Sequence, residues 1–566
     1  RIRLLKLPEN TGLGHALNQG LDATSAPYVA YLPSDDLYFR DHLASLHAAL
    51  QAQSPGVLAC AGIRSRGVAS VPGRDVVQAP GRIPGEPMQL VQVMHRRTED
   101  RWIERDELTT DDLDRMLWNR LLAGAAPVET GEVTCEWVRH PRQRHLALRE
   151  PAGGLNTYRS RYRVKQPLRL QSTIGVSHDE VEEYRADRER PDTPVAQDGL
   201  RILLVGELAH NPERVLALEE RGHKLYGLWT KDPYWFNYVG PLPFGHVEDL
   251  PPDNWEDALE RLRPDVIYGL LNYQAIPLAD RVLSRARALG IPFVWHLKEG
   301  PFFSRKAGTW PELVRLHTRS NGQIYSSEEL RDWFGAVLPA TRALPSLVLD
   351  GDLPRRPRQE GRRSALLSDT DGEPHTLIAG RPMGPDPEFV GRLAAHGVHV
   401  HLYGEKVQMQ MRDWVQACQR LAPGHLHLHP QVPPSRWVEE FSRYDAGWLH
   451  DFRSANGGDI LAAIWDDLNV PARVATLATA GVPFIQRDNS DSAVATDSLA
   501  RRQDLSVFFS GPEDLAEQLK DRQRMGHLRE SVWSQRELFT FDAHVDRLVE
   551  FLRSAIAIAG ADPGTG

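Results

Sequence analysis

The stretch Arg201-Ile202-Leu203-Leu204-Val205-Gly206 decides the fold of the larger part of the chain. A continuous run of branched apolar residues predicts a strand that is buried on both faces, as in parallel sheets. Gly206 ends the run, residues 211–221 have the period of an amphipathic helix, and Gly222 follows as a helix cap. This order of strand, turn and helix predicts the start of a Rossmann-like unit.

The same alternation continues on both sides of a loop rich in Arg, Pro and Gly, from Asp350 to Pro374. Further strands are predicted at 265–270, 292–295, 323–325, 375–379, 399–403, 425–429, 446–450 and 482–486. We therefore expect two Rossmann-like lobes, at 200–350 and 351–554, and a flexible tail at 555–566.

Residues 1–149 show another α/β pattern, with a strand at Tyr28–Leu32 and a helix over 41–51. Arg1–Lys6 predicts a strand entered in the middle of a fold, so we expect this part to be N-terminally incomplete. Residues 150–199 lose periodicity, and the polar run from Tyr184 to Gly199 predicts a linker. The sequence thus predicts an α/β domain, a connecting segment and a double Rossmann-like unit.

The composition excludes several classes of protein. Hydrophobic residues make up 41% and charged residues 25%, which is typical of globular chains. A net charge of −9 with dispersed Lys and Arg argues against a nucleic-acid partner. Three distant cysteines and no apolar run of about 20 residues indicate a protein of the cytoplasm, either soluble or peripheral to the inner membrane.

Two adjacent carboxylates, Asp35 and Asp36, follow the strand predicted at 28–32. Carboxylates at the end of a strand can hold Mg²⁺ or Mn²⁺, which prefer oxygen ligands, and such an ion can neutralise a diphosphate. The alternative interpretation is an Asp-Asp cap on the next helix. Spacing alone leaves both open.

The run from Asn10 to Leu43 resembles the middle of family 2 glycosyltransferases, especially the spore-coat polysaccharide type, which have the GT-A fold. The resemblance implies that Asp36 ligates the metal, and that Asp35 and Asn10 bind the donor. It departs at Pro33, where most relatives have a further Asp. It also lacks the first two strands of the family, which bind the nucleobase.

Acidic residues gather again at Thr110-Asp111-Asp112-Leu113-Asp114, where a helix is predicted to begin. Stabilisation of the helix dipole would explain them, at about 0.3–1 kcal/mol each. In family 2 the corresponding acidic pair is catalytic, which implies Asp111 and Asp112 here, with Asp112 removing the proton of the acceptor hydroxyl. His140 resembles a late histidine that completes the metal shell, although a structural histidine is the alternative.

Residues 200–552 resemble GT-B glycosyltransferases, most closely family 4. The resemblance implies that His296 faces the cleft of the acceptor lobe and that Arg381 meets the donor diphosphate, which suits a guanidinium. Asn469, Arg473 and Gly481 match the donor-lobe helix and the turn after it. The alternatives are surface ion pairs for both arginines and a buried core imidazole for His296.

These resemblances imply a tandem enzyme that transfers sugars from nucleoside diphosphate sugars to carbohydrate or lipid-linked acceptors in surface glycan synthesis. The first module would use Mg²⁺ or Mn²⁺, whereas the second would require no metal. Leu468 and Thr476 stand where family 4 relatives have two glutamates, so a module that only binds glycans is the alternative. A nicotinamide-dependent enzyme is disfavoured, because Gly206-Glu207-Leu208 lacks the glycine series that cradles a pyrophosphate.

Overall fold

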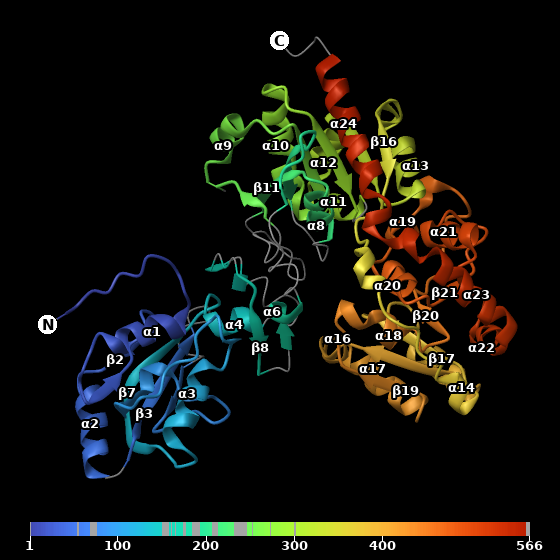
Figure 1. Cartoon of the computed structure of the whole chain (residues 1–566). Coiled ribbons are helices and arrows are strands. Elements are labelled where there is room, and N and C mark those ends of the chain that lie inside the picture. The colour runs from blue at the N-terminus through green and yellow to red at the C-terminus, as the bar shows by residue number, and fades with distance from the viewer. Residues whose placement is uncertain are drawn as a thin grey trace. The chain divides into compact units, whose positions relative to one another are not determined.

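The computed structural model describes the chain except residues 1, 54–55, 68–75, 150–157, 160, 163, 165, 174–176, 184–192, 207–212, 231–245, 252, 272, 299–300 and 562–566. The chain divides into two compact units, unit 1 (Arg1–Glu182) and unit 2 (Glu183–Gly566), which are described separately (Figure 1). None of the described helices combines the length and the apolar character that a membrane crossing requires.

Unit 1 contains a mixed sheet. Among its described residues, six strands pair in the order β1-β5-β3-β7-β2, with β4 beside β3. The long central strands β3 and β7 are parallel, and the other pairs are antiparallel. The strands are β1 (Tyr28–Ala30), β2 (Leu37–Tyr38), β3 (Leu58–Gly67), β4 (Val76–Ala79), β5 (Val93–Arg96) and β7 (Val128–Arg139).

Helices cover this sheet because their apolar residues recur on one face. Leu46 and Leu50 of the second helix are fully buried, as are Ala59 and Ala61 of β3, which pack in the same cluster. On the other side Tyr31, Trp102 and Trp118 form an aromatic core. The helices are α1 (Leu13–Asp22), α2 (His42–Ala52), α3 (Leu113–Leu122) and α4 (Arg144–Leu148).

A smaller sheet extends unit 1 into the segment that the sequence predicted as a connection. β6 (Thr109–Thr110) pairs with β8 (Arg169–Gln171), which pairs with β9 (Ser177–Asp179), and α6 (Glu180–Glu183) follows. The buried pair of Arg159 and Glu180 helps to hold this segment. Short strands separated by polar residues gave too weak a period to be predicted. Most of the polar run at 184–199 lies outside the described residues.

The strand predicted at Arg1–Lys6 is not formed. Residues 2–7 have no regular structure, and the side chains of Ile2 and Leu4 are exposed. No strand of the described part pairs with this segment, and an apolar run forms a strand only where it has a partner.

Unit 2 begins with a parallel sheet. In its described part the order is β12-β11-β10-β13-β14-β15-β16. The strands are β10 (Arg201–Gly206), β11 (Lys224–Trp229), β12 (Glu248–Asp249), β13 (Val266–Leu271), β14 (Phe293–Leu297), β15 (Gly322–Tyr325) and β16 (Ser346–Val348). The helices are α8 (Glu213–Glu220), α9 (Trp255–Leu262), α10 (Ile276–Ala288), α11 (Phe302–Ala307), α12 (Trp310–Arg319) and α13 (Glu328–Val337).

The second lobe has a parallel sheet of described strands in the order β19-β18-β17-β20-β21-β22. They are β17 (His375–Ala379), β18 (His399–Tyr403), β19 (Leu426–His429), β20 (Ala446–Trp448), β21 (Phe484–Arg487) and β22 (Ser506–Phe509). The helices are α14 (Ser368–Asp371), α15 (Pro387–Ala395), α16 (Glu405–Gln410), α17 (Arg412–Leu421), α18 (Trp437–Phe441), α19 (Trp465–Leu468), α20 (Arg473–Thr479), α21 (Ala495–Gln503), α22 (Pro512–Lys520) and α23 (Arg522–Gln535).

Short 3₁₀ helices occur in both units. Unit 1 contains η1 (Leu90–Gln92), and unit 2 contains η2 (Tyr273–Ala275), η3 (Pro339–Ala343), η4 (Arg356–Gln359), η5 (Pro434–Arg436), η6 (Ile460–Ala462), η7 (Arg536–Phe539) and η8 (Phe541–Ala543).

Both lobes have the strand order of a Rossmann fold. In each sheet the first strand in sequence, β10 or β17, lies between the second and the fourth, so the direction of winding reverses beside it. This order confirms the predicted double Rossmann-like fold. It also fixes where a ligand is expected, because ligands of such sheets bind at the carboxyl ends of the strands next to the reversal.

The last helix, α24 (Val545–Ala561), returns to the first lobe. It packs against α8, β14 and β15, and Figure 1 shows it running beside elements of that lobe. Gly322 of β15 leaves the room that the ring of Phe551 fills, since a Cβ there would lie 2.9 Å from the ring. Residues 545–554 were predicted to belong to the second lobe. The sequence did not reveal their place, because the amphipathic period of a helix does not identify the surface that the helix covers.

Candidate functional site

In unit 1, Asp35 and Asp36 lie in the turn between β1 and β2. Asp36 is 8% exposed, and its Oδ1 accepts a hydrogen bond of 3.0 Å from the backbone N–H of Val138 in β7. A strand follows the pair, and the cap position of α2 belongs to Asp41. The alternative interpretation of the pair as a helix cap is therefore excluded.

The surroundings of Asp36 disfavour its negative charge. The pKa of Asp36 is raised to about 7, mainly by burial and also by the carboxylate of Asp35, against the lowering effects of the Val138 N–H and of His140. Asp114, in the first turn of α3, also raises the pKa of Asp36. A cation near this carboxylate would relieve both the burial penalty and the repulsion.

His140 lies beside Asp35. Its Nε2 is 2.9 Å from Oδ2 of Asp35, and both side chains are partly exposed. The structure thus brings Asp35, Asp36 and His140 to one place. Among the described residues, however, the groups of three side chains whose ligand atoms lie within 4.8 Å of one another are both in unit 2. Asp35, Asp36 and His140 do not form such a group in this conformation.

The carboxylate of Asp111 is bound by side chains and backbone groups outside the acidic turn. Its buried carboxylate lies 2.5 Å from Nε of Arg149, and it accepts hydrogen bonds from the backbone N–H and the hydroxyl of Thr173. Burial would raise the pKa of Asp111, but the bonds from Thr173 and Arg149 outweigh it and lower the pKa. Asp111 therefore ties the small sheet to α3, which fits a structural role better than the predicted catalytic one.

Asp112 stands at the N-terminus of α3, where its Oδ2 accepts a 2.8 Å hydrogen bond from Nε of Arg115. Asp114 lies one half-turn further on. The pKa of Asp114 is raised to about 6, because burial outweighs the lowering effect of the charge of Arg144. No role was predicted for Asp114 from the sequence. Its position two residues after Asp112 was visible in the sequence, but its burial and its effect on Asp36 were not.

Asn10 holds the start of α1. Its Oδ1 accepts a hydrogen bond of 3.1 Å from the N–H of Gly12, and Arg105 donates to the backbone oxygen of Asn10. These contacts explain Asn10 without a ligand.

In unit 2, two arginines meet at the reversal of the second sheet. Arg381 follows Gly380 at the carboxyl end of β17, and Arg473 opens α20. Arg473 Nη2 donates to the backbone oxygen of Arg381 at 2.6 Å, and Nη1 donates to that of Trp448, the last residue of β20, at 3.4 Å. The guanidinium of Arg473 therefore bridges the ends of β17 and β20, where a ligand is expected.

This arginine pair has no counter-charge in the described part of the chain, where no carboxylate forms an ion pair with Arg381 or Arg473. The pKa of Arg473 is lowered to about 10, mainly by burial and also by the charge of Arg381. The surface ion pairs of the alternative interpretation are thus not observed. Two guanidiniums that repel each other would be stabilised by a bound anion.

Two other predicted donor residues have mainly structural contacts. Asn469 is nearly buried and ends α19, where its N–H donates to the oxygen of Trp465. Gly481 has φ +67° and lies so close to the ring of Trp533 that a Cβ would be 2.5 Å from it. Gly481 is therefore required by the turn after α20 and by packing.

His296 is a core residue. It is fully buried in β14, with Nδ1 2.7 Å from the hydroxyl of Tyr268, and burial holds its pKa well below the ordinary value. The prediction that His296 faces the cleft therefore fails, because position 296 points into the sheet packing and the alternative interpretation applies.

Lys298, two residues further on, was missed. Its Nζ lies 2.7 Å from both Asp350 and Asp352 and donates to the oxygen of Val470 in the second lobe at 3.0 Å. A lone lysine after a strand gives no signal in the sequence, because its acidic partners lie some fifty residues away.

A cavity of about 300 Å³ lies elsewhere in the second lobe. Asp369, Arg522 and Arg529 are among its lining residues, whereas none of the predicted site residues is.

The acidic turn of unit 1 lies in the segment of the chain that has a recognised relationship. Residues 1–97 match the family model "Glycosyl transferase family 2". This match confirms the resemblance predicted from Asn10–Leu43, and it agrees with the predicted class of nucleotide-sugar-dependent transferases. It includes Asp35 and Asp36, whereas Asp112 and His140 lie beyond it. No curated protein matches the sequence significantly.

Several solved structures resemble about two thirds of the chain. The catalytic domain of starch synthase IV from Arabidopsis thaliana, bound to ADP and acarbose, is 11% identical with a TM-score of 0.42, and the match covers 64% of this chain and 100% of that one. The S. aureus MnaA–UDP structure is 10% identical with a TM-score of 0.39, covering 64% and 99%. A UDP-N-acetylglucosamine 2-epimerase is 12% identical with a TM-score of 0.36, covering 65% and 99%. Such distant likenesses carry no argument about activity, and the two-lobed fold rests on the strand orders.

Proposed function

We propose that this protein transfers a sugar from a nucleoside diphosphate sugar to a carbohydrate or lipid-linked acceptor, in the synthesis of a surface glycan. One observation carries the proposal: within the segment that matches family 2, a buried carboxylate of raised pKa, Asp36, lies beside Asp35 and His140. A buried acid of this kind is costly unless a cation or substrate uses it. We place the activity in the cytoplasm, either in solution or at the periphery of the inner membrane.

In unit 1 we assign Asp36, Asp35 and His140 to a Mg²⁺ or Mn²⁺ ion. Two carboxylates and one imidazole suit such ions, provided that Asp36 turns from the Val138 N–H. The ion would neutralise the leaving diphosphate. Asp112 is our candidate for the base that accepts the proton of the acceptor hydroxyl, which requires that Arg115 release it on binding. Asp114, half-buried two residues further on with its pKa raised to about 6, is the second candidate.

In unit 2 we assign the arginine pair to the diphosphate of a donor. Arg473 is already oriented by two backbone oxygens, so little side-chain entropy is lost when it binds phosphate oxygens. This site would need no metal, because the cations are part of the chain. Asn469 lies nearby at the end of α19 and would be a further residue that binds the donor.

A second function is favoured for unit 2 by one observation. Leu468, where family 4 relatives have a glutamate, is buried in the apolar core and presents no polar group. Unit 2 would then bind glycan or nucleotide without transferring sugar.

The experiment is a transfer assay with UDP-, GDP- and ADP-sugars, performed on the full chain and on its Asp36→Ala and Arg473→Met variants. If both modules are active, each variant loses part of the activity. If unit 2 only binds, Asp36→Ala abolishes turnover and Arg473→Met leaves it intact. Sugar transfer that persists unchanged in both variants would refute the assignment of both sites.

A further inference from the structure

Six histidines form a ladder on three neighbouring strands of the second lobe. The members of this histidine ladder are His375 of β17, His399 and His401 of β18, His425 directly before β19, and His427 and His429 of β19. They occupy alternate positions, and the strand register places His375 beside His399 and His401 beside His427. All six therefore lie on one face of the sheet.

The imidazoles form two hydrogen-bonded chains, each of which ends on a carboxylate. In the first, His375 Nε2 lies 2.9 Å from Asp371 Oδ2, and its Nδ1 lies 2.8 Å from His401 Nε2. In the second, His399 Nε2 lies 2.7 Å from Glu373 Oε2, and its Nδ1 lies 2.9 Å from His427 Nε2. Both chains have the same direction, with Nε2 towards the acidic end.

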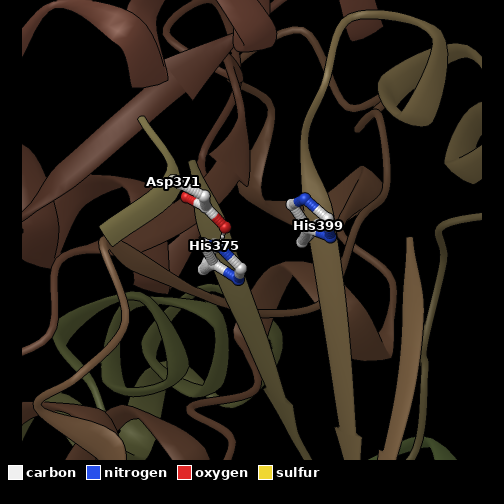
Figure 2. A group of neighbouring side chains, drawn as sticks. All are labelled: Asp371, His375 and His399. Carbon is white, nitrogen blue, oxygen red and sulfur yellow. Dashed lines mark hydrogen bonds and ion pairs between the residues drawn. The ribbon is translucent and has the colours of Figure 1, made fainter. Parts of the chain in front are cut away.

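The acidic ends of the two chains meet. The rings of His375 and His399 stack at 4.4 Å with an interplanar angle of 5°, and the Nε2 atom of each faces a carboxylate, that of Asp371 or that of Glu373. The ligand atoms of Asp371, His375 and His399 lie within 4.8 Å of one another. Figure 2 shows the two imidazoles on adjacent strands, with Asp371 directed at His375.

We propose that Asp371, His375 and His399 bind one transition-metal ion of the Zn²⁺ class. Two imidazole nitrogens and a carboxylate suit such an ion better than they suit Mg²⁺. Ligand atoms around zinc lie about 3.3 Å apart, given bonds of about 2.0–2.1 Å. Because the two stacked ring planes are nearly parallel, at least one imidazole must tilt towards the other so that both Nε2 lone pairs meet one ion. Glu373, whose Oε2 lies 2.7 Å from Nε2 of His399, is placed to supply the fourth ligand.

The rest of the ladder supports these ligands. A metal-binding histidine usually donates its second ring N–H to an acceptor, which fixes the ring. With the ion on Nε2, His375 and His399 carry their protons on Nδ1 and donate them to Nε2 of His401 and His427.

The site is accessible from one side. The side chain of His375 is 7% exposed, whereas those of Asp371 and Glu373 are 45% and 46% exposed. An ion can therefore enter past the carboxylates and reach imidazoles that are shielded from water.

The position of the ion indicates a structural role. His375 and His399 are the first residues of β17 and β18, whereas the arginine pair lies at the carboxyl ends of the strands. The ion thus binds at the opposite edge of the sheet from the proposed donor site. It ties the turn after α14 to two strands, and it would stabilise the lobe without taking part in transfer.

The test is calorimetric titration of the metal-free full chain with Zn²⁺, in excess Mg²⁺ so that the acidic turn of unit 1 is occupied. The wild type should bind one Zn²⁺, and its melting temperature should rise with the ion. Asp371→Asn, which keeps the hydrogen bond to His375, should weaken binding at least tenfold, and His399→Gln at least a hundredfold. Sugar transfer should be unchanged by Zn²⁺ removal.

The matched control is His425→Gln. His425 belongs to a second group, Glu373, His399 and His425, which shares His399 with the first. The proposal requires that His425→Gln bind Zn²⁺ within about threefold of the wild type. Loss of binding in His425→Gln with retention in Asp371→Asn would overturn it, as would a wild type that binds no Zn²⁺. Asp371 is half-exposed, so its variant remains informative even if the His399 variant fails to fold.

Discussion

The acidic turn of unit 1 and the arginine pair of unit 2 present opposite charges at the sites proposed for the same chemical group. Asp36 is a buried acid whose pKa stays raised despite the nearby His140, and Arg473 is a buried cation without a carboxylate partner in the described part of the chain. By contrast, buried Lys298 is compensated by Asp350 and Asp352. A buried charge without a partner destabilises the folded state unless a ligand supplies the opposite charge. Asp36 and Arg473 therefore require a ligand, whereas Lys298 does not.

The largest effect is expected for Asp36→Ala. Removing this carboxylate should lower the metal-dependent transfer by at least about 100-fold in kcat/KM, because the ion and the diphosphate lose a ligand. Steady-state kinetics with Mn²⁺ measure it. The matched control is Asp22→Ala, which removes an exposed acid paired with Arg101 and should leave the rate unchanged. Equal rates for both variants would remove Asp36 from the site.

Arg473→Met should weaken the metal-independent binding of a nucleoside diphosphate about 30-fold, since a hydrogen bond to a charged group contributes about 2 kcal/mol. The folded state should lose little net stability, because removing a buried charge that has no carboxylate partner offsets the loss of the two hydrogen bonds to backbone oxygens. Arg487, whose Nε lies 2.8 Å from the buried Asp451, provides the contrast. Arg487→Met should destabilise the protein, since it leaves a carboxylate unpaired. A large loss of stability in Arg473→Met would show that its charge is already compensated.

Asp36→Asn should stabilise metal-free protein at about pH 8, by between about 1 and 2 kcal/mol after allowance for partial hydration. The folded pKa of Asp36 is raised from 3.8 to about 7. The penalty for folding is therefore absent below about pH 4 and grows as the pH rises towards 7, while the unfolded chain is already ionised. Chemical denaturation at both pH values measures the difference. Equal free energies of unfolding for the wild type and Asp36→Asn at about pH 8 would mean that folding does not raise the pKa of Asp36.

His140→Gln should have the smallest effect, a loss of about threefold to tenfold in Mn²⁺ affinity, because both carboxylates remain. Competition between Mn²⁺ and a fluorescent chelator measures the affinity. A loss as large as that of Asp36→Ala would make His140 a principal ligand, and no loss would make its contact with Asp35 a surface ion pair.

Much of the fold could be predicted from the sequence. The buried run at 201–206 and the alternating strands after it predicted two Rossmann-like lobes, because parallel strands read as continuous apolar runs. The helix over 41–51 and the strand at Tyr28 were also predicted closely. The small sheet of β6, β8 and β9 and the return of α24 were not predicted, since both depend on long-range packing.

The residues of the candidate sites could be predicted only in part from the sequence. Asp35, Asp36 and His140 were brought together as expected, but Asp111 is held by Arg149 and Thr173 and His296 is buried in the core, and Asp114 and Lys298 were missed. Residue type and spacing indicate which groups can do chemistry, whereas burial and pairing decide which ones remain available. The partner of Asp111, Arg149, is 38 residues away, and no local pattern reveals it.

The most direct test of the central claim is calorimetric titration of the full chain with UDP, GDP and ADP in turn, in Mn²⁺ and in EDTA. We expect two binding events for a cognate nucleotide. One requires Mn²⁺ and is lost in Asp36→Ala, and the other persists in EDTA and is lost in Arg473→Met. A nucleotide that binds equally well to both variants, or no binding under either condition, would contradict the assignment of these charges to diphosphate.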